Sequence, residues 1–125
     1  MQACVDNFTH RLASKCQTCD GYLMKRTMFI QSPPLLAFDI SSCALTLDPV
    51  IWISCLNSRF RYVLRGVIYF ENQHFTERVI TSTGMIWYHD GIFTGPSLVY
   101  ESQDLTTITM QNAVMAFYAR SPLAV

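Results

Sequence analysis

The sequence predicts an α+β domain made mostly of antiparallel β-sheet, with one short helix near its N-terminus. Short runs rich in β-branched and aromatic residues recur along the chain, with polar or glycine-containing turns between them. Near the start, over residues 3–15, apolar residues instead recur at helical spacing. The chain has 125 residues, half of them hydrophobic, which is enough for one buried core and too little for two.

The predicted helix over residues 3–15 depends on Val5, Phe8 and Leu12, which fall on one face of a helix. We expect this face to pack on the core. The segments predicted as strands are 22–30, 35–40, 50–53, 62–70, 75–80, 85–89 and 97–100. Pro33 and Pro34 separate the first two, because proline has no amide hydrogen for the hydrogen-bond ladder.

The remaining segments are less regular. Residues 41–50 are expected to form a polar loop, residues 101–109 have threonine-rich β character, and residues 121–125 are expected to be a frayed tail. Residues 112–120 are apolar at both the helical and the strand period, so the residues alone do not decide between the two structures.

His74 and Asp90 are the candidate catalytic residues. His74 begins the strand predicted up to residue 80, and Asp90 follows the strand over residues 85–89. Neighbouring strands lie about 4.8 Å apart, so a meander brings both side chains to one edge of the sheet. A carboxylate bonded to one imidazole nitrogen leaves the other free to take a proton from a thiol or hydroxyl. The alternative is that His74 is a surface or hydrogen-bonded structural residue.

Cys16 and Cys19 form a C-x-x-C pair. Two thiolates on one tight turn suit half of a tetrahedral zinc site, although zinc requires four ligands. The alternative is two thiols without a metal. A redox pair is disfavoured because no thioredoxin-like βαβ pattern follows.

Charge and cysteine usage exclude several classes of protein. Nine basic and nine acidic residues balance, and no basic cluster marks a nucleic-acid-binding face. No run of about 18 apolar residues predicts a membrane span. The first ten residues lack the pattern of a secretory signal, and the five cysteines are irregularly spaced. We therefore expect a reduced, intracellular protein, cytoplasmic or nuclear.

Four separated motifs between about residues 5 and 120 resemble the C-terminal part of the ubiquitin-specific proteases, papain-like cysteine hydrolases that cut ubiquitin from proteins. The C-x-x-C pair is followed by KRTMFIQSPPLL, similar to the family's K-x-x-x-I-x-x-L-P-P-x-L. YVLRGVIY and the HFT that follows it together resemble the strand and base motif of the family, and WYHD resembles the motif of the orienting acid. NAVMAFYAR resembles the closing strand of these enzymes.

The resemblance implies the palm-like half of a papain-like fold, a single partial domain over residues 1–125, and a strand at residues 112–120. It assigns His74 as the general base and Asp90 as the orienting acid. It implies ubiquitin or a ubiquitin-like protein as partner, no required cofactor, and a structural zinc in which Cys16 and Cys19 supply two ligands. The family's partner pair of cysteines lies earlier in its domain.

Gln73, Phe75 and Trp87 are the expected substrate-binding residues, with core packing as the alternative role for Trp87. The family usually has glycine where this chain has Gln73, and a second acid where it has Gly91. A side chain at position 73 would crowd the channel that admits the Gly-Gly tail of ubiquitin, so a different modifier is conceivable. His89, beside Asp90, is a weaker candidate for the base.

The family's nucleophile box, G-N-T-C followed by an aromatic residue, does not occur in this sequence. A base and an acid without a thiol cannot form an acyl-enzyme. The first hypothesis is therefore a hydrolase part that is inactive alone and takes its thiol from a missing N-terminal half or a partner. The second is a non-catalytic β module that binds ubiquitin or another partner. The third is an unrelated sheet closed around a hydrophobic ligand.

Overall fold

The computed structural model describes residues 1–6, 9–41 and 46–122. Within them, one large antiparallel sheet and one separate hairpin make up most of the structure. The elements are α1 (Gln2–Asp6), β1 (Thr9–Lys15), β2 (Tyr22–Arg26), β3 (Leu35–Asp39), β4 (Val50–Cys55), β5 (Ser58–Glu71), β6 (His74–Ile80), β7 (Ile86–His89), β8 (Val99–Ser102), the 3₁₀ turn η1 (Leu105–Thr107) and β9 (Ala113–Arg120). The predicted mainly antiparallel β-structure with one short helix is thereby confirmed.

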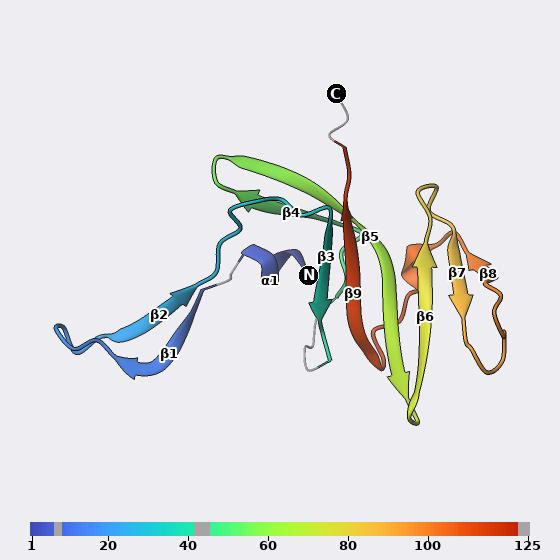
Figure 1. Ribbon diagram of the computed structural model, residues 1–125, viewed down its shortest axis with the longest axis horizontal. Coiled ribbons are helices and arrows are strands. Elements are labelled where there is room, and N and C mark those ends of the chain that lie inside the picture. The colour runs from blue at the N-terminus through green and yellow to red at the C-terminus, as the bar shows by residue number, and fades with distance from the viewer. Residues whose placement is uncertain (7–8, 42–45, 123–125) are drawn as a thin grey trace.

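The large sheet is built around β5, which has 14 residues. Its strand order is β3-β9-β5-β6-β7-β8, and the first part of β5 also pairs with β4. The figure shows β5 running from β4 across the sheet to its hairpin with β6 (Figure 1). The described strands leave β3 and β8 as separate edges, so this sheet does not close around a ligand as the third hypothesis required.

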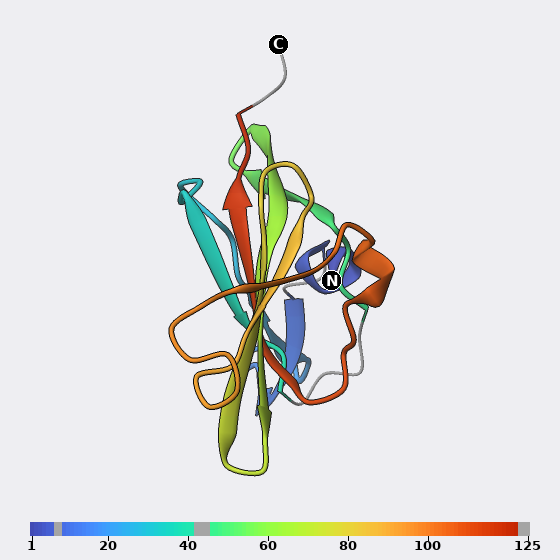
Figure 2. The same ribbon diagram turned by 90° about the vertical axis from the view of Figure 1, so that its right-hand side faces the viewer.

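The hydrophobic core lies on one face of this sheet. Val67, Ile86 and Ala116 are fully buried there, on three different strands, because alternate residues of a strand point to the same face. Val5 of α1 belongs to the same cluster, and Leu105 of η1 packs against it. Both elements lie on the same side of the sheet (Figure 2). The face is covered in its middle and left open towards the β5–β6 turn.

The predicted helix over residues 3–15 is wrong beyond its first turn. The helix ends at Asp6, and β1 pairs with β2 as an antiparallel hairpin that projects from the large sheet (Figure 1). Three apolar positions are too few to distinguish the helical period from the strand period. The turn that contains the C-x-x-C pair and ends at Gly21 reverses the chain, so that β2 pairs with β1. Val5 is buried as expected, Leu12 is half-buried, and Phe8 lies outside the described residues.

Other predicted boundaries differ by a few residues. The strand expected over 22–30 ends at Arg26, the strand expected over 50–53 continues to Cys55, and 97–100 is displaced to Val99–Ser102. Residues 105–107 form a 3₁₀ turn instead of continuing the β character expected over 101–109, because the Asp104 side chain caps them. The segment 112–120 is the strand β9. Positions 42–45 of the predicted loop and 123–125 of the tail lie outside the described residues.

Helices long and apolar enough to cross a membrane are absent from the part of the chain that the structure describes.

Candidate active site

A tight turn between β5 and β6 places His74. Asn72 and Gln73 both have positive φ, 50° and 61°, and Glu71 pairs with His74 across the turn. Two left-handed residues in a two-residue loop make the turn whose twist matches a β-hairpin. Asparagine tolerates this conformation well, whereas glutamine is strained in it. The glycine that the resembling family has at position 73 would be free of that strain.

Gln73→Gly is therefore expected to stabilise the chain by about 1 kcal/mol. Left-handed backbone costs a residue other than glycine about 1–3 kcal/mol, and glycine removes this cost. Part of the gain is offset because glycine makes the unfolded chain more flexible and so favours the unfolded state. The urea midpoint of unfolding measures the change. Gln111→Gly is the matched control and is not expected to stabilise, because the backbone of Gln111 itself does not have a positive φ. An unchanged or lower midpoint for Gln73→Gly would refute the strain at this turn.

Asp90 directly follows β7 and is held by the loop that it begins. Its Oδ1 accepts hydrogen bonds from the amides of Ile92 and Phe93 at 2.9 and 3.2 Å. The Tyr88 hydroxyl donates to Oδ2 at 3.2 Å, and Thr94 donates through Oγ1 to the Asp90 carbonyl at 2.8 Å. Asp90 is 3% exposed, so the two amides and the Tyr88 hydroxyl replace the water that the carboxylate loses.

His74 and Asp90 meet as the sequence predicts. The register of β6 and β7 pairs Glu77 with His89, which brings Asp90 diagonally across from His74 on the same face. Nε2 of His74 lies 2.8 Å from Oδ1 of Asp90. Because a carboxylate only accepts, Nε2 carries the hydrogen. Among the described residues, Nδ1 makes no hydrogen bond or ion pair, so this nitrogen is free to accept a proton.

The hydrogen bonds at Asp90 change its acidity. Loss of water alone raises the pKa of the Asp90 carboxyl. The amide of Ile92, the imidazole of His74 and the amide of Phe93 outweigh this and lower the pKa from 3.8 to about 2. Asp90 is therefore ionised throughout the physiological range. Burial, and after it the contact with the Asp90 carboxylate, raises the pKa of the Tyr88 hydroxyl, which stays a donor.

The lowered pKa of Asp90 makes stability depend on pH at the acidic end. Because the folded pKa lies below the unfolded value, the contribution is complete above about pH 4 and is lost as the pH falls towards 2. We expect Asp90→Asn to lose less of its stability than the parent chain between pH 4.5 and 2, because asparagine has no proton to gain. Urea midpoints of both proteins across this range test it. Parallel profiles would contradict the prediction.

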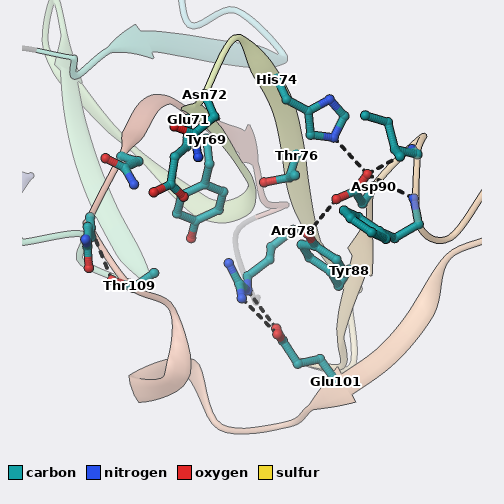
Figure 3. Close-up of a pocket in the computed structure, with 14 residues that line it drawn as sticks. Tyr69, Glu71, Asn72, His74, Thr76, Arg78, Tyr88, Asp90, Glu101 and Thr109 are labelled. Carbon is teal, nitrogen blue, oxygen red and sulfur yellow. Dashed lines mark hydrogen bonds and ion pairs between the residues drawn. The ribbon is translucent and has the colours of Figure 1, made fainter.

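A cavity of about 550 Å³ opens beside the pair, on the core face of the sheet (Figure 3). Arg78 lies in it and makes two hydrogen bonds to Glu101, at 2.7 and 2.8 Å. The guanidinium also lies 5.0 Å from the ring centre of Tyr69 and 5.4 Å from that of Tyr88. The Tyr69 hydroxyl is buried near the Arg78 guanidinium, but it makes no hydrogen bond of 3.5 Å or less in the described part of the chain. The cavity is thus lined by polar groups, of which Arg78 and Glu101 form an ion pair and the Tyr69 hydroxyl makes no hydrogen bond.

Tyr69→Phe is expected to raise the free energy of unfolding by about 1 kcal/mol, because it removes a buried hydroxyl that makes no hydrogen bond. Tyr62→Phe is the matched control, since the Tyr62 hydroxyl donates to the Pro33 carbonyl at 2.6 Å and its loss should destabilise. Chemical denaturation of both variants measures the two changes. Destabilisation by Tyr69→Phe would show that the hydroxyl has a partner.

The expected substrate-binding residues do not line this cavity. Gln73 is exposed at the tip of the turn. Phe75 points to the opposite face of β6 from His74, is 61% exposed, and packs on Phe70 with ring centres 4.6 Å apart. Trp87 packs edge-on against Tyr100 at 5.7 Å, also away from the cavity. A substrate role for these residues stays a prediction.

His89, the weaker candidate for the base, is engaged elsewhere. Its Nε2 lies 3.0 Å from the carbonyl of Gly95, and its Nδ1 lies 3.4 Å from the Glu77 carboxylate. Both ring nitrogens therefore have partners, whereas His74 has one nitrogen free. This difference favours His74 as the base.

Cys16 and Cys19 lie on the turn of the β1–β2 hairpin. Sγ of Cys16 accepts a hydrogen bond from the Thr18 amide at 3.5 Å and lies 3.2 Å from the Thr18 hydroxyl. The hydroxyl, then the amide, and then contacts from Cys19 lower the pKa of the Cys16 thiol from 9.0 to about 7. A thiolate held this way is a suitable metal ligand.

Only half of a zinc site fits the described residues. They contain no group of three or more His, Cys, Asp or Glu side chains that would hold a metal ion. Cys4 belongs to α1, Cys55 is buried at the end of β4, and Cys43 lies outside the described residues. Cys16 and Cys19 supply two of the four ligands that structural zinc takes.

Sequence reasoning missed the residues that hold the pair. Neither Tyr88 and Thr94, which bond Asp90, nor the cavity residues Tyr69, Arg78 and Glu101 are singled out by the sequence. One local signal was present: aspartate accepts hydrogen bonds from amides two and three positions later, and D-G-I-F-T has the form of such a turn. The Arg78–Glu101 pair spans 23 positions, and no local pattern predicts it.

No protein-family model matches the chain, and no curated protein matches it significantly.

Proposed function

We propose that this chain supplies the base and the orienting acid of a papain-like thiol hydrolase of the ubiquitin-specific protease type, and that its thiol comes from another polypeptide segment. The contact that carries the proposal is the 2.8 Å hydrogen bond between Nε2 of His74 and Oδ1 of Asp90. It holds the imidazole in one tautomer and leaves Nδ1 for a thiol. The order of the four sequence motifs supports the same family.

The reaction is acyl transfer at the carbonyl of a C-terminal glycine of ubiquitin or a ubiquitin-like modifier. Nδ1 of His74 takes the proton of the thiol, and the thiolate attacks the carbonyl carbon. The imidazolium then gives its proton to the leaving amine, and a water molecule, deprotonated by the same nitrogen, releases the acyl group. Asp90 stabilises the imidazolium in each half of the reaction.

The proposal places the thiol on another polypeptide segment. The residues that line the cavity beside His74 include no cysteine in the described part of the chain. Cys16 and Cys19 sit at the end of a projecting hairpin, and Cys55 is buried. The surface next to the pair is apolar, with Ile92 69% and Phe93 85% exposed. An apolar rim of this kind suits a docked protein segment.

A ubiquitin-binding or partner-binding module without catalysis is the alternative, and the same apolar rim favours it. The two functions differ in what His74 does. Catalysis requires its Nδ1, whereas binding through Ile92 and Phe93 does not.

The test uses a ubiquitin probe with a thiol-reactive C-terminus. The full chain is incubated with the probe alone, and again with the nucleophile-box half of a ubiquitin-specific protease whose own base has been removed. We expect an adduct on the nucleophile of that half only when the chain is present. His74→Ala should lower its rate at least about 100-fold, the usual contribution of a positioned base.

His89→Ala is the matched control and is expected to leave the rate nearly unchanged, because both ring nitrogens of His89 are bonded away from the cavity. Ubiquitin binding that survives His74→Ala, with no adduct in any mixture, would establish the binding module instead. An adduct of the chain alone, mapped to one of its own cysteines, would overturn the division of the site between two segments.

A further inference from the structure

In the described part of the chain, Tyr88 is the one hydrogen-bond partner of Oδ2 of Asp90. Three donors bond the other oxygen, Oδ1: Nε2 of His74 at 2.8 Å, and the amides of Ile92 and Phe93 at 2.9 and 3.2 Å. Oδ2 accepts from the Tyr88 hydroxyl at 3.2 Å (Figure 3). The Asp90 side chain is only 4% exposed, so water does not take the place of this donor. Oδ1 thus depends on His74 and the following loop, whereas Oδ2 depends on Tyr88.

The bond to Oδ2 decides how the carboxylate is turned. The two oxygens of an ionised carboxylate are equivalent acceptors, and a buried oxygen without a donor is costly. Without the Tyr88 hydroxyl, the carboxylate of Asp90 would gain by turning until both oxygens share the three remaining donors. That rotation would move Oδ1 away from its place opposite Nε2 of His74. Tyr88 therefore controls the orientation of the imidazole without touching it.

The polar groups of the cavity hold Tyr88 in place. Tyr88 lies two positions before Asp90, and alternation along the strand puts both side chains on one face. Its ring lies 5.4 Å from the Arg78 guanidinium, which a tyrosine ring attracts. Glu101 fixes that guanidinium through two hydrogen bonds, and Figure 3 shows Arg78 between the rings of Tyr69 and Tyr88. The cluster thus connects the edge strand β8 to the carboxylate of Asp90.

We propose that Tyr88 is a positioning residue of the candidate active site, and that its hydroxyl holds the Asp90 carboxylate in the rotation that keeps His74 ready as a base. For its part in the reaction, the inference rests on the proposed function. Tyr88 bonds the orienting acid and none of the reacting atoms, so it acts on the rate only through Asp90.

The first test uses the full chain alone and the variant Tyr88→Phe, which removes the hydroxyl and keeps the ring beside Arg78. Nitrogen-15 NMR near neutral pH reports which nitrogen of His74 carries hydrogen. We expect the variant to show a fraction of chains with hydrogen on Nδ1, larger than in the parent and smaller than in Asp90→Ala. Urea midpoints are measured alongside. A lower midpoint with the same His74 spectrum as the parent would make Tyr88 merely structural and overturn the inference.

Tyr100→Phe is the matched control. Tyr100 is 49% exposed on the neighbouring strand β8, and its ring packs on Trp87, away from the cavity. The loss of its hydroxyl should leave the His74 spectrum at that of the parent. A change as large as the one caused by Tyr88→Phe would show that the spectrum does not report the bond to Oδ2, and would overturn the inference.

The second test measures probe labelling in the two-part assay as the concentration of the nucleophile-box half is raised. Tyr88→Phe should lower the rate at saturation at least about 10-fold, the usual worth of a hydrogen bond to a charged group. The concentration that gives half of this rate should not change, because the hydroxyl is directed at Asp90. Weaker docking with an unchanged saturated rate would contradict a positioning role. If the parent chain forms no adduct, the proposed function fails, and the spectra of the chain alone still decide whether Tyr88 positions the pair.

Discussion

Replacing Asp90 with alanine is expected to lower the rate of probe labelling in the two-part assay by about 10³- to 10⁴-fold, because the imidazole loses both its orientation and its counter-charge. Asp90→Asn should cost less. The asparagine oxygen can take the place of Oδ1, accept from the amides of Ile92 and Phe93, and still accept from Nε2 of His74. That variant keeps the tautomer and loses only the charge.

The order of the two Asp90 variants is therefore informative. If Asp90→Ala reacts much more slowly than Asp90→Asn, orientation of the imidazole contributes more to the rate than the negative charge does. If the two variants react at equal rates, the negative charge contributes more. Thr106→Ala is the control, because it changes a polar residue of η1 that contacts neither His74 nor Asp90. It should leave the rate unchanged. Rates at the parent level for both Asp90 variants would remove Asp90 from the reaction.

Ile51→Ala is expected to destabilise the chain by about 3–4 kcal/mol, the loss of a buried side chain plus the cavity that it leaves. Ile51 is fully buried on β4, opposite Tyr62 of the long strand β5. Domains of this size have total stabilities of about 5–15 kcal/mol, so the variant would be only marginally folded at 37 °C.

Ser54→Ala is the matched control for Ile51→Ala, since Ser54 lies on the same strand and faces solvent. Its effect should stay within about 0.5 kcal/mol. Urea denaturation followed by tryptophan fluorescence measures both variants. A small loss for Ile51→Ala would mean that the core does not depend on the pairing of β4 with β5.

The pairing of His74 with Asp90 was predictable because two local rules determine it. A polar turn after residues 62–70 starts the next strand at His74, and alternation along β6 and β7 puts both side chains on one face. The strands β5, β6 and β7 follow from the same composition and period, whereas β9 was predicted from the family resemblance, because its residues alone fit both a helix and a strand. Their bounds shifted by a few residues, since flanking polar residues such as Ser58 also find a partner strand.

The prediction of a helix over residues 3–15 was wrong because the structure there depends on a distant segment and not on local rules. Three apolar positions satisfy a helical period by chance, and the pairing of β1 with β2, which replaces most of that helix, depends on the later segment 22–26. The cavity escaped prediction because it is assembled from distant parts of the chain, with Tyr69 on β5 and Thr109 near β9. Long-range assembly of that kind has no local sequence signature.

The tautomer of His74 tests the central claim most directly, and it needs no partner. Nitrogen-15 NMR of the labelled chain near neutral pH distinguishes a protonated Nε2 from a protonated Nδ1. The 2.8 Å contact with Asp90 predicts hydrogen on Nε2 and a bare Nδ1, with this preference lost in Asp90→Ala. Hydrogen on Nδ1, or the same mixture of tautomers in the parent and the variant, would show that Asp90 does not hold His74 as a base.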